Sequence, residues 1–255
     1  MSDAVPGLRH VEHVMGSVFS FDVRDEPTPA LRRALDEAVI HLHRVDEVFS
    51  TYRPDSYISR LGRGEIRRED CPPEVLEVLR LCAHATRVSD GWFSVVPEGT
   101  LDPSGLVKGW AVEAASHILH EAGARHICVN GGGDIQLRGP AAPGTPWRIG
   151  IAHPLRPGEL VTVVTAHDDL AVATSGTAER GAHVFDPHSG RPATGFASLT
   201  LVGPRLTLTD SYATAAFARG EGARSWLEGL HGYEALAVTP DGEEWVTTGF
   251  HRYGS

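Results

Sequence analysis

The sequence predicts an α+β fold in which helices pack on a mixed, largely antiparallel sheet. Two long stretches place apolar residues at the spacing of one helical face. Short apolar runs separated by glycine- and proline-rich turns follow them, as in a sheet of short strands. At 255 residues and 41% hydrophobic, the chain can bury a core as one unit over 1–255, with room for two closely joined lobes.

Charge and cysteine content exclude several classes of protein. The formal net charge of −10 argues against a nucleic-acid partner, because phosphate binding needs a concentrated basic surface. No run approaches the roughly 18 apolar residues that cross a bilayer, and the first residues lack the pattern of a signal peptide. The three cysteines have no metal-like spacing and suit reduced thiols. We therefore expect a cytoplasmic protein without a membrane segment.

The first elements are a strand and a helix. His10 to Val23 carries the composition of a strand, interrupted at Met15-Gly16-Ser17 by a glycine. A bulge and the close approach of a ligand explain that glycine equally well. Pro29 to Phe49 is an amphipathic helix that leads into a turn-rich loop. Tyr52 in this loop is either packed or free to stack on a flat ligand.

Two more helices follow. Pro72 to Val88 is predicted as a helix that ends at Asp90-Gly91. The next helix, running through Leu119, places Lys108 in its first turn. A lysine there opposes the helix dipole, which is easier to explain if the lysine faces a phosphate. The glycine spacing of a P-loop is absent.

Short strands occupy the middle of the chain. Arg125 to Val129 and Ile135 to Arg138 flank the glycine turn at 130–134. This turn leads into a strand, which excludes a Rossmann fingerprint, and it is either an ordinary turn or a ligand-lining one. The meander continues with three further predicted strands: Trp147–Ile151, Leu160–Thr165 and Leu170–Ala173.

A polar stretch from Ala173 to Gly190 concentrates groups suited to chemistry. It combines the hydroxyl-rich turn predicted at 174–176 with His183 and Asp186, and His183 titrates near neutral pH. An ordinary hairpin with a polar turn is the alternative interpretation.

The last part of the chain contains a candidate metal pair. Ser198 to Val202 is a predicted strand, and a helix follows with Thr209 as its N-cap. Asp210 and Thr214 then lie four residues apart on one helical face, where their oxygens can hold Mg²⁺. An acid that only complements the helix dipole is the alternative. The remaining elements are a helix and two strands: Gly222–Leu230, Tyr233–Thr239 and Glu244–Thr248.

Seven stretches that are weak signals singly become specific in combination. They are Met15-Gly16-Ser17, the loop ending at Ser56, Gly91-Trp92-Phe93, DPSGLVKGWAVE from Asp102 to Glu113, NGGGD ending at Asp134, ATSG with His183 and Asp186-Pro187, and Asp210 with Thr214. In this order they resemble the ApbE family of FAD:protein FMN transferases, and the resemblance covers nearly the whole chain.

The resemblance implies a reaction and a site. Members move FMN from FAD to a threonine or serine hydroxyl of a target protein and release AMP. The implied Mg²⁺ ligands are Asp210, Thr214 and the carbonyl of Gly105, and the implied catalytic residue is His183. The implied FAD contacts are Met15, Tyr52, Trp92, Phe93, Ser94, Asp102, Lys108 and Val184. The partners expected are therefore FAD and an FMN-acceptor protein.

The sequence departs from the family pattern at a few positions. Ser94 and Glu113 stand where aspartate is usual, and Ala213 cannot supply a carboxylate that some members carry. Two other functions fit the same residues. One is an Mg²⁺-dependent FAD pyrophosphatase that yields FMN and AMP, and the other is a non-catalytic FAD-binding protein.

Overall fold

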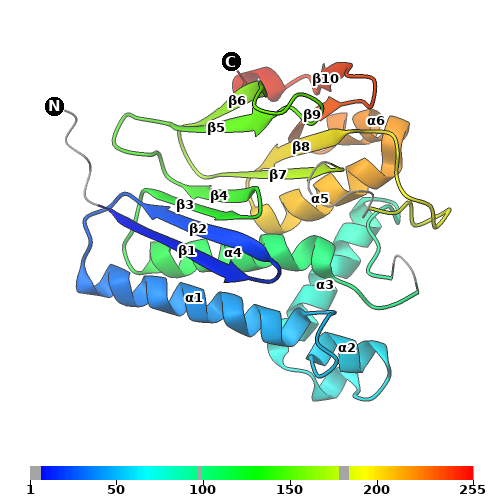
Figure 1. Ribbon diagram of the computed structural model, residues 1–255, viewed down its shortest axis with the longest axis horizontal. Helices are drawn as coiled ribbons and strands as arrows, with labels where there is room; N and C mark the ends of the chain where they lie inside the picture. The colour runs from blue at the N-terminus through cyan, green and yellow to red at the C-terminus, as the bar shows by residue number, and fades with distance from the viewer. Residues whose placement is uncertain (1–6, 97–98, 178–183, 255) are drawn as a thin grey trace.

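An eight-stranded sheet with helices against one face forms the centre of the protein. The computed structural model describes residues 7–96, 99–177 and 184–254. Helices α1, α4 and α5 contact the sheet through β1, β3 and β4, and β7 and β8, respectively, as Figure 1 shows. All strand pairs in the described part are antiparallel. The predicted α+β class is confirmed.

The strands follow one another across the sheet almost in chain order, β1-β2-β3-β4-β7-β8-β9-β10. Their bounds are β1 Leu8–Val14, β2 Ser17–Val23, β3 Ile127–Gly131, β4 Asp134–Arg138, β7 Leu170–Gly176, β8 Ser198–Gly203, β9 Glu234–Val238 and β10 Glu244–Val246. The remaining two strands, β5 Trp147–Ala152 and β6 Leu160–Ala166, pair with each other as a separate two-stranded sheet. The predicted meander is therefore interrupted by this hairpin.

The helices are long where the sequence has helical periodicity and short elsewhere. Their bounds are α1 Pro29–Phe49, α2 Tyr57–Gly62, α3 Pro73–Val88, α4 Ser104–Glu121, α5 Leu206–Arg219 and α6 Ala223–Glu228, with 3₁₀ turns at Arg68–Asp70, Gly220–Gly222 and Phe250–Arg252. Helix α1 matches its prediction residue for residue. Helix α2 was missed, because six residues are too few to show a 3.6-residue period.

The N-terminal strand prediction was wrong in its connectivity. The structure has a hairpin at the predicted interruption, with β1 paired to β2 from Leu8 and Val23 to Val14 and Ser17. Met15 and Gly16 form the turn, and both have positive φ angles, 52° and 64°. Two consecutive residues with positive φ are the signature of the tight turn that joins antiparallel strands. Methionine is not among the residues that favour positive φ, such as glycine and asparagine, so the sequence signal for this turn is weak.

Two further boundaries differ from the predictions. Strand β7 continues through Gly176 rather than ending in a turn, because Thr174 and Ser175 pair with β8. Helix α4 begins at Ser104, so Lys108 lies in its second turn and not in its first. The argument from an unfavourable helix dipole at Lys108 therefore does not apply.

Helix α4 lies at the centre of the hydrophobic core. Helix α4 packs against α1 and α5 as well as the sheet, and residues all around it are buried, including Leu106, Val112 and Leu119. A second apolar cluster, with Trp147 and Leu137, lies between the two-stranded and eight-stranded sheets. No helix in the described ranges is long and apolar enough to cross a membrane.

Candidate active site

A cavity of about 540 Å³ opens between the β1–β2 turn, the end of α1 and the facing sides of α4 and α5. This volume lies within the range of small-molecule sites in proteins. All the candidate site residues that lie in the described part of the chain line this cavity: Met15, Tyr52, Trp92, Phe93, Ser94, Asp102, Gly105, Lys108, Val184, Asp210 and Thr214. His183 lies outside the described residues. Its neighbour Val184 is buried in the wall of the cavity.

Aromatic residues form part of the wall. Tyr52 is 96% exposed in the loop after α1, so its ring is available at the mouth. The Trp92 ring meets the His188 ring edge to face, with 4.5 Å between their centroids. Phe93 is buried and lies close to Gly105 at the start of α4. Flat rings at the mouth suit a planar heteroaromatic ligand.

Lys108 is paired with a buried carboxylate. Its ammonium forms an ion pair with Asp134, which is 1% exposed. The other carboxylate oxygen of Asp134 accepts a hydrogen bond from the Thr174 amide at 3.0 Å. Asp134, the last residue of NGGGD, thus joins β4, β7 and the lysine. The Asp134 carboxylate therefore balances the charge of Lys108 even without a bound anion.

The other charged groups of the cavity wall are acidic. Asp46, Asp102 and Asp210 line it, and Lys108 is the one basic side chain among the described lining residues. The described lining residues thus carry net negative charge, which disfavours an anionic ligand such as a diphosphate. An added cation would reduce this repulsion.

We predict that Asp134→Asn lowers the free energy of unfolding by about 1–3 kcal/mol. Asparagine keeps an acceptor for the Thr174 amide, but it removes the negative charge that faces the partly buried ammonium of Lys108. Urea unfolding measures the change. Asp169→Asn is the matched control, because Asp169 is half-exposed and pairs with Arg138 at 3.5 Å. Equal losses in the two variants would contradict the prediction.

Asp210, Thr214 and Gly105 come together where α4 crosses α5. The Asp210 side chain is buried, and one of its oxygens accepts a hydrogen bond from the Gly109 amide at 3.0 Å. A Cβ built on Gly105 would lie 3.7 Å from the Thr214 hydroxyl. Carboxylate, hydroxyl and backbone carbonyl oxygens are ligands for a hard cation such as Mg²⁺.

The oxygens gathered between α4 and α5 are hard ligands. Within the part of the chain that the structure describes, no three His, Cys, Asp or Glu side chains form a metal cluster. A metal between α4 and α5 would have one carboxylate and neutral oxygens. This set leaves places for water, as Mg²⁺ prefers.

Gly109 sets the distance between α4 and α5. A Cβ at this position would lie 2.7 Å from the Leu206 carbonyl oxygen and 2.8 Å from Asp210 Cβ. Both contacts are too short for real atoms, and the first involves backbone that cannot rotate away. The helices therefore approach closely because residue 109 has no side chain.

We predict that Gly109→Ala lowers the free energy of unfolding by about 1–3 kcal/mol. Alanine in a helix normally stabilises by up to about 1 kcal/mol relative to glycine, so the expected sign is reversed. Gly229→Ala is the control, because its Cβ would meet only the Trp226 carbonyl, at an ordinary 3.5 Å. Thermal unfolding of both variants measures the difference. A Gly109→Ala protein as stable as the control would contradict the close approach.

Some lining residues carried no signal in the sequence. Asp46 lies in the last turn of α1, where its spacing fits an ordinary exposed helix face. Phe185 follows Val184 and reads as a core residue. Asp134 was quoted only as part of a motif, and nothing local shows that it contacts a lysine 26 positions earlier.

The sequence and the fold resemble those of known proteins. The sequence matches the ApbE family over residues 15–99 and 95–237. The FAD:protein FMN transferase of Vibrio cholerae is 33% identical over 135 residues, which are 49% of this chain and 40% of that protein. The FAD:protein FMN transferase of Rhodobacter capsulatus is 31% identical over 197 residues, 70% of this chain and 37% of that protein. The aligned parts thus span about two fifths of these relatives.

Solved structures share the fold over nearly their whole length. The apo form of the flavinyl transferase ApbE of Pseudomonas stutzeri superposes with a TM-score of 0.83 at 21% identity, covering 99% of each chain. The ApbE protein of Thermotoga maritima gives a TM-score of 0.85 at 20% identity, covering 98% of this chain and 99% of that one. At this identity the likeness establishes the fold.

Proposed function

Because the chain belongs to the ApbE family, we propose that it is an FAD:protein FMN transferase. It would move FMN from FAD to a threonine or serine hydroxyl of a target protein and release AMP. One observation carries the proposal. Residues nominated from six separate stretches of sequence line a single cavity of about 540 Å³. Residues with no shared site have no physical reason to converge in this way.

Mg²⁺ fits the oxygens gathered between α4 and α5. Asp210, Thr214 and the carbonyl of Gly105 would hold it, and Asp210 is already buried and oriented by the Gly109 amide. When bound, the cation neutralises charge on the diphosphate of FAD and on the leaving AMP. The acidic cavity wall supports this dependence, since Lys108 is already paired with Asp134.

The remaining residues would bind and orient the reactants. Tyr52 and Trp92 present flat rings for the isoalloxazine or the adenine. Lys108, fixed by Asp134, would donate to a phosphate oxygen. The oxygen of the acceptor hydroxyl attacks the phosphorus of the FMN half, the bond to the AMP oxygen breaks, and AMP leaves. His183 would take the hydroxyl proton, which a neutral imidazole can accept near pH 7.

We propose the cytosol as the compartment and residues 1–255 as one catalytic unit. Cys71, Cys82 and Cys128 are free thiols, which suits a reducing compartment. Burial raises the pKa of the Cys82 and Cys128 thiols to about 12, so both stay protonated and unreactive.

To test the function, the protein is incubated with FAD, Mg²⁺ and candidate acceptor proteins. The acceptors are then separated on a denaturing gel. Flavin fluorescence that stays on one acceptor, a mass gain of one FMN on it, and AMP release that stops with a chelator would support the transferase. AMP and free FMN formed at the same rate with and without acceptor would identify a pyrophosphatase instead. FAD bound without AMP release would identify a binding protein.

A further inference from the structure

Helix α5, which carries Asp210 and Thr214, is capped by residues from other elements. We propose that Glu113 and Gln136 are positioning residues that fix α5 against α4 and thereby set the metal-binding geometry of Asp210 and Thr214. This inference rests on the proposed function, because it assigns the two residues to the proposed Mg²⁺ site.

Helix α5 has no cap of its own. The residue before it is Arg205, whose side chain makes no capping hydrogen bond, and the first turn contains no acidic residue. Thr209, the predicted N-cap, lies inside the helix and donates its hydroxyl to the Arg205 carbonyl at 2.8 Å. The first free amides of a helix need acceptors, so distant residues must supply them.

Glu113 of α4 supplies one acceptor. One carboxylate oxygen accepts from the Thr207 amide at 2.9 Å and from the Thr207 hydroxyl at 2.6 Å. The other accepts from the Arg205 guanidinium at 2.7 Å. Glu113 is 8% exposed, so this charge lies at the N-terminus of α5 in a poorly hydrated place. The helix dipole favours an anion there.

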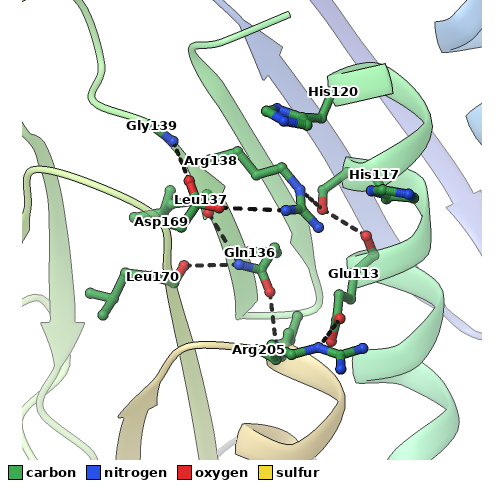
Figure 2. Close-up of polar contacts among 12 residues, drawn as sticks. Glu113, His117, His120, Gln136, Leu137, Arg138, Gly139, Asp169, Leu170 and Arg205 are labelled. Atoms are coloured by element: carbon green, nitrogen blue, oxygen red, sulfur yellow. Dashed lines mark hydrogen bonds and ion pairs between the residues drawn. The ribbon is translucent and has the colours of Figure 1, made fainter. Parts of the chain in front are cut away.

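Gln136 of β4 supplies the second acceptor. Its side-chain oxygen accepts from the Leu206 amide at 2.9 Å. Its amide nitrogen donates to the carbonyls of Leu137 at 3.1 Å and Leu170 at 3.4 Å, which fixes the direction of the oxygen. Figure 2 shows Gln136 between the Leu170 carbonyl and the start of α5, with Glu113 beside Arg205. Gln136 is 1% exposed, so water cannot replace it.

Three of the contacts between α4 and α5 recur once per helical turn. Glu113 meets Thr207, Gly109 meets Asp210 and Gly105 lies against Thr214. The positions fall by four along α4 as they rise by three or four along α5. The two helices therefore run antiparallel, with one contact per helical turn of about 5.4 Å.

This arrangement couples the cap to the proposed metal ligands. A helix moves as a nearly rigid unit over two turns, so a shift of its first residues along α4 moves Asp210 relative to Gly105. Gly109 holds the middle contact and cannot supply a side chain to fix the register. Glu113 and Gln136 both bind the first turn of α5, and together with the Asp210 carboxylate on the Gly109 amide they fix this register.

The experiment measures metal affinity directly, without FAD or acceptor, using Mn²⁺ as the probe and its electron paramagnetic resonance signal. Glu113→Gln keeps the length of the side chain but turns one accepting oxygen into a donor, so Arg205 or Thr207 loses its partner. The expected Mn²⁺ affinity is about 10- to 100-fold weaker, as for other residues that orient metal ligands. Glu121→Gln is the control, because Glu121 lies on the same helix with its side chain 68% exposed.

Gln136→Met removes the second acceptor without changing the size of the side chain much, and it tests the proposal if Glu113→Gln does not fold. We expect Gln136→Met to weaken Mn²⁺ binding as well. Each variant is measured at a temperature well below its midpoint of thermal unfolding. Variants that unfold at lower temperature but bind Mn²⁺ like the wild type would overturn the proposal and leave the proposed function intact. A wild-type protein that binds no Mn²⁺ would overturn both.

Discussion

Asp210→Asn is expected to lower the rate of FMN transfer by about 10³-fold. Asparagine keeps the acceptor for the Gly109 amide but removes the one carboxylate of the proposed metal site. A catalytic metal supplies several kcal/mol of charge stabilisation, and each 1.4 kcal/mol is a factor of ten in rate. The initial rate of AMP release at saturating FAD and Mg²⁺ measures the effect.

Two controls separate loss of the metal from general damage. Asp46→Asn removes another acid of the same cavity wall, and its rate should stay within about tenfold of the wild type because Asp46 lies outside the proposed ligand set. Equilibrium dialysis should show weaker Mn²⁺ binding only in Asp210→Asn. An Asp210→Asn protein that keeps full Mg²⁺-dependent activity would show that the metal is held elsewhere.

His183→Ala is expected to lower the rate of transfer by about 10²- to 10⁴-fold, the usual contribution of a general base. The acceptor hydroxyl must lose its proton as its oxygen bonds to phosphorus, and alanine cannot accept one. FAD affinity should change little, since the proposed binding contacts are other residues. Single-turnover transfer to an acceptor, together with FAD binding by fluorescence quenching, separates the two steps.

His188→Ala is the matched control for His183. His188 is five residues further along, and its ring contacts Trp92 at the wall of the cavity. Its loss should weaken FAD binding more than it slows transfer from bound FAD. If His183→Ala transfers FMN at the wild-type rate, another group takes the proton and His183 has no part in the chemical step.

Local patterns predicted the long elements of the fold. Helix α1 shows its apolar face over 21 residues, so its bounds follow from periodicity alone. The hairpin at Met15 was missed because a non-glycine residue adopts φ of 52° there, which the surrounding chain imposes. Thr209 was misassigned because it has the chemistry of an N-cap, whereas the actual acceptors come from 70 or more positions away.

The order of seven weak motifs in the sequence by itself indicates the family and, with it, the candidate residues. The structure decided what those residues do to one another. It alone shows that Lys108 is neutralised by Asp134, that Gly109 lets α4 and α5 approach, and that Glu113 and Gln136 cap α5. The physical reason is that a sequence records side-chain chemistry and local spacing. Ion pairs, close approach and long-range caps depend on distances that exist only once distant segments are packed together.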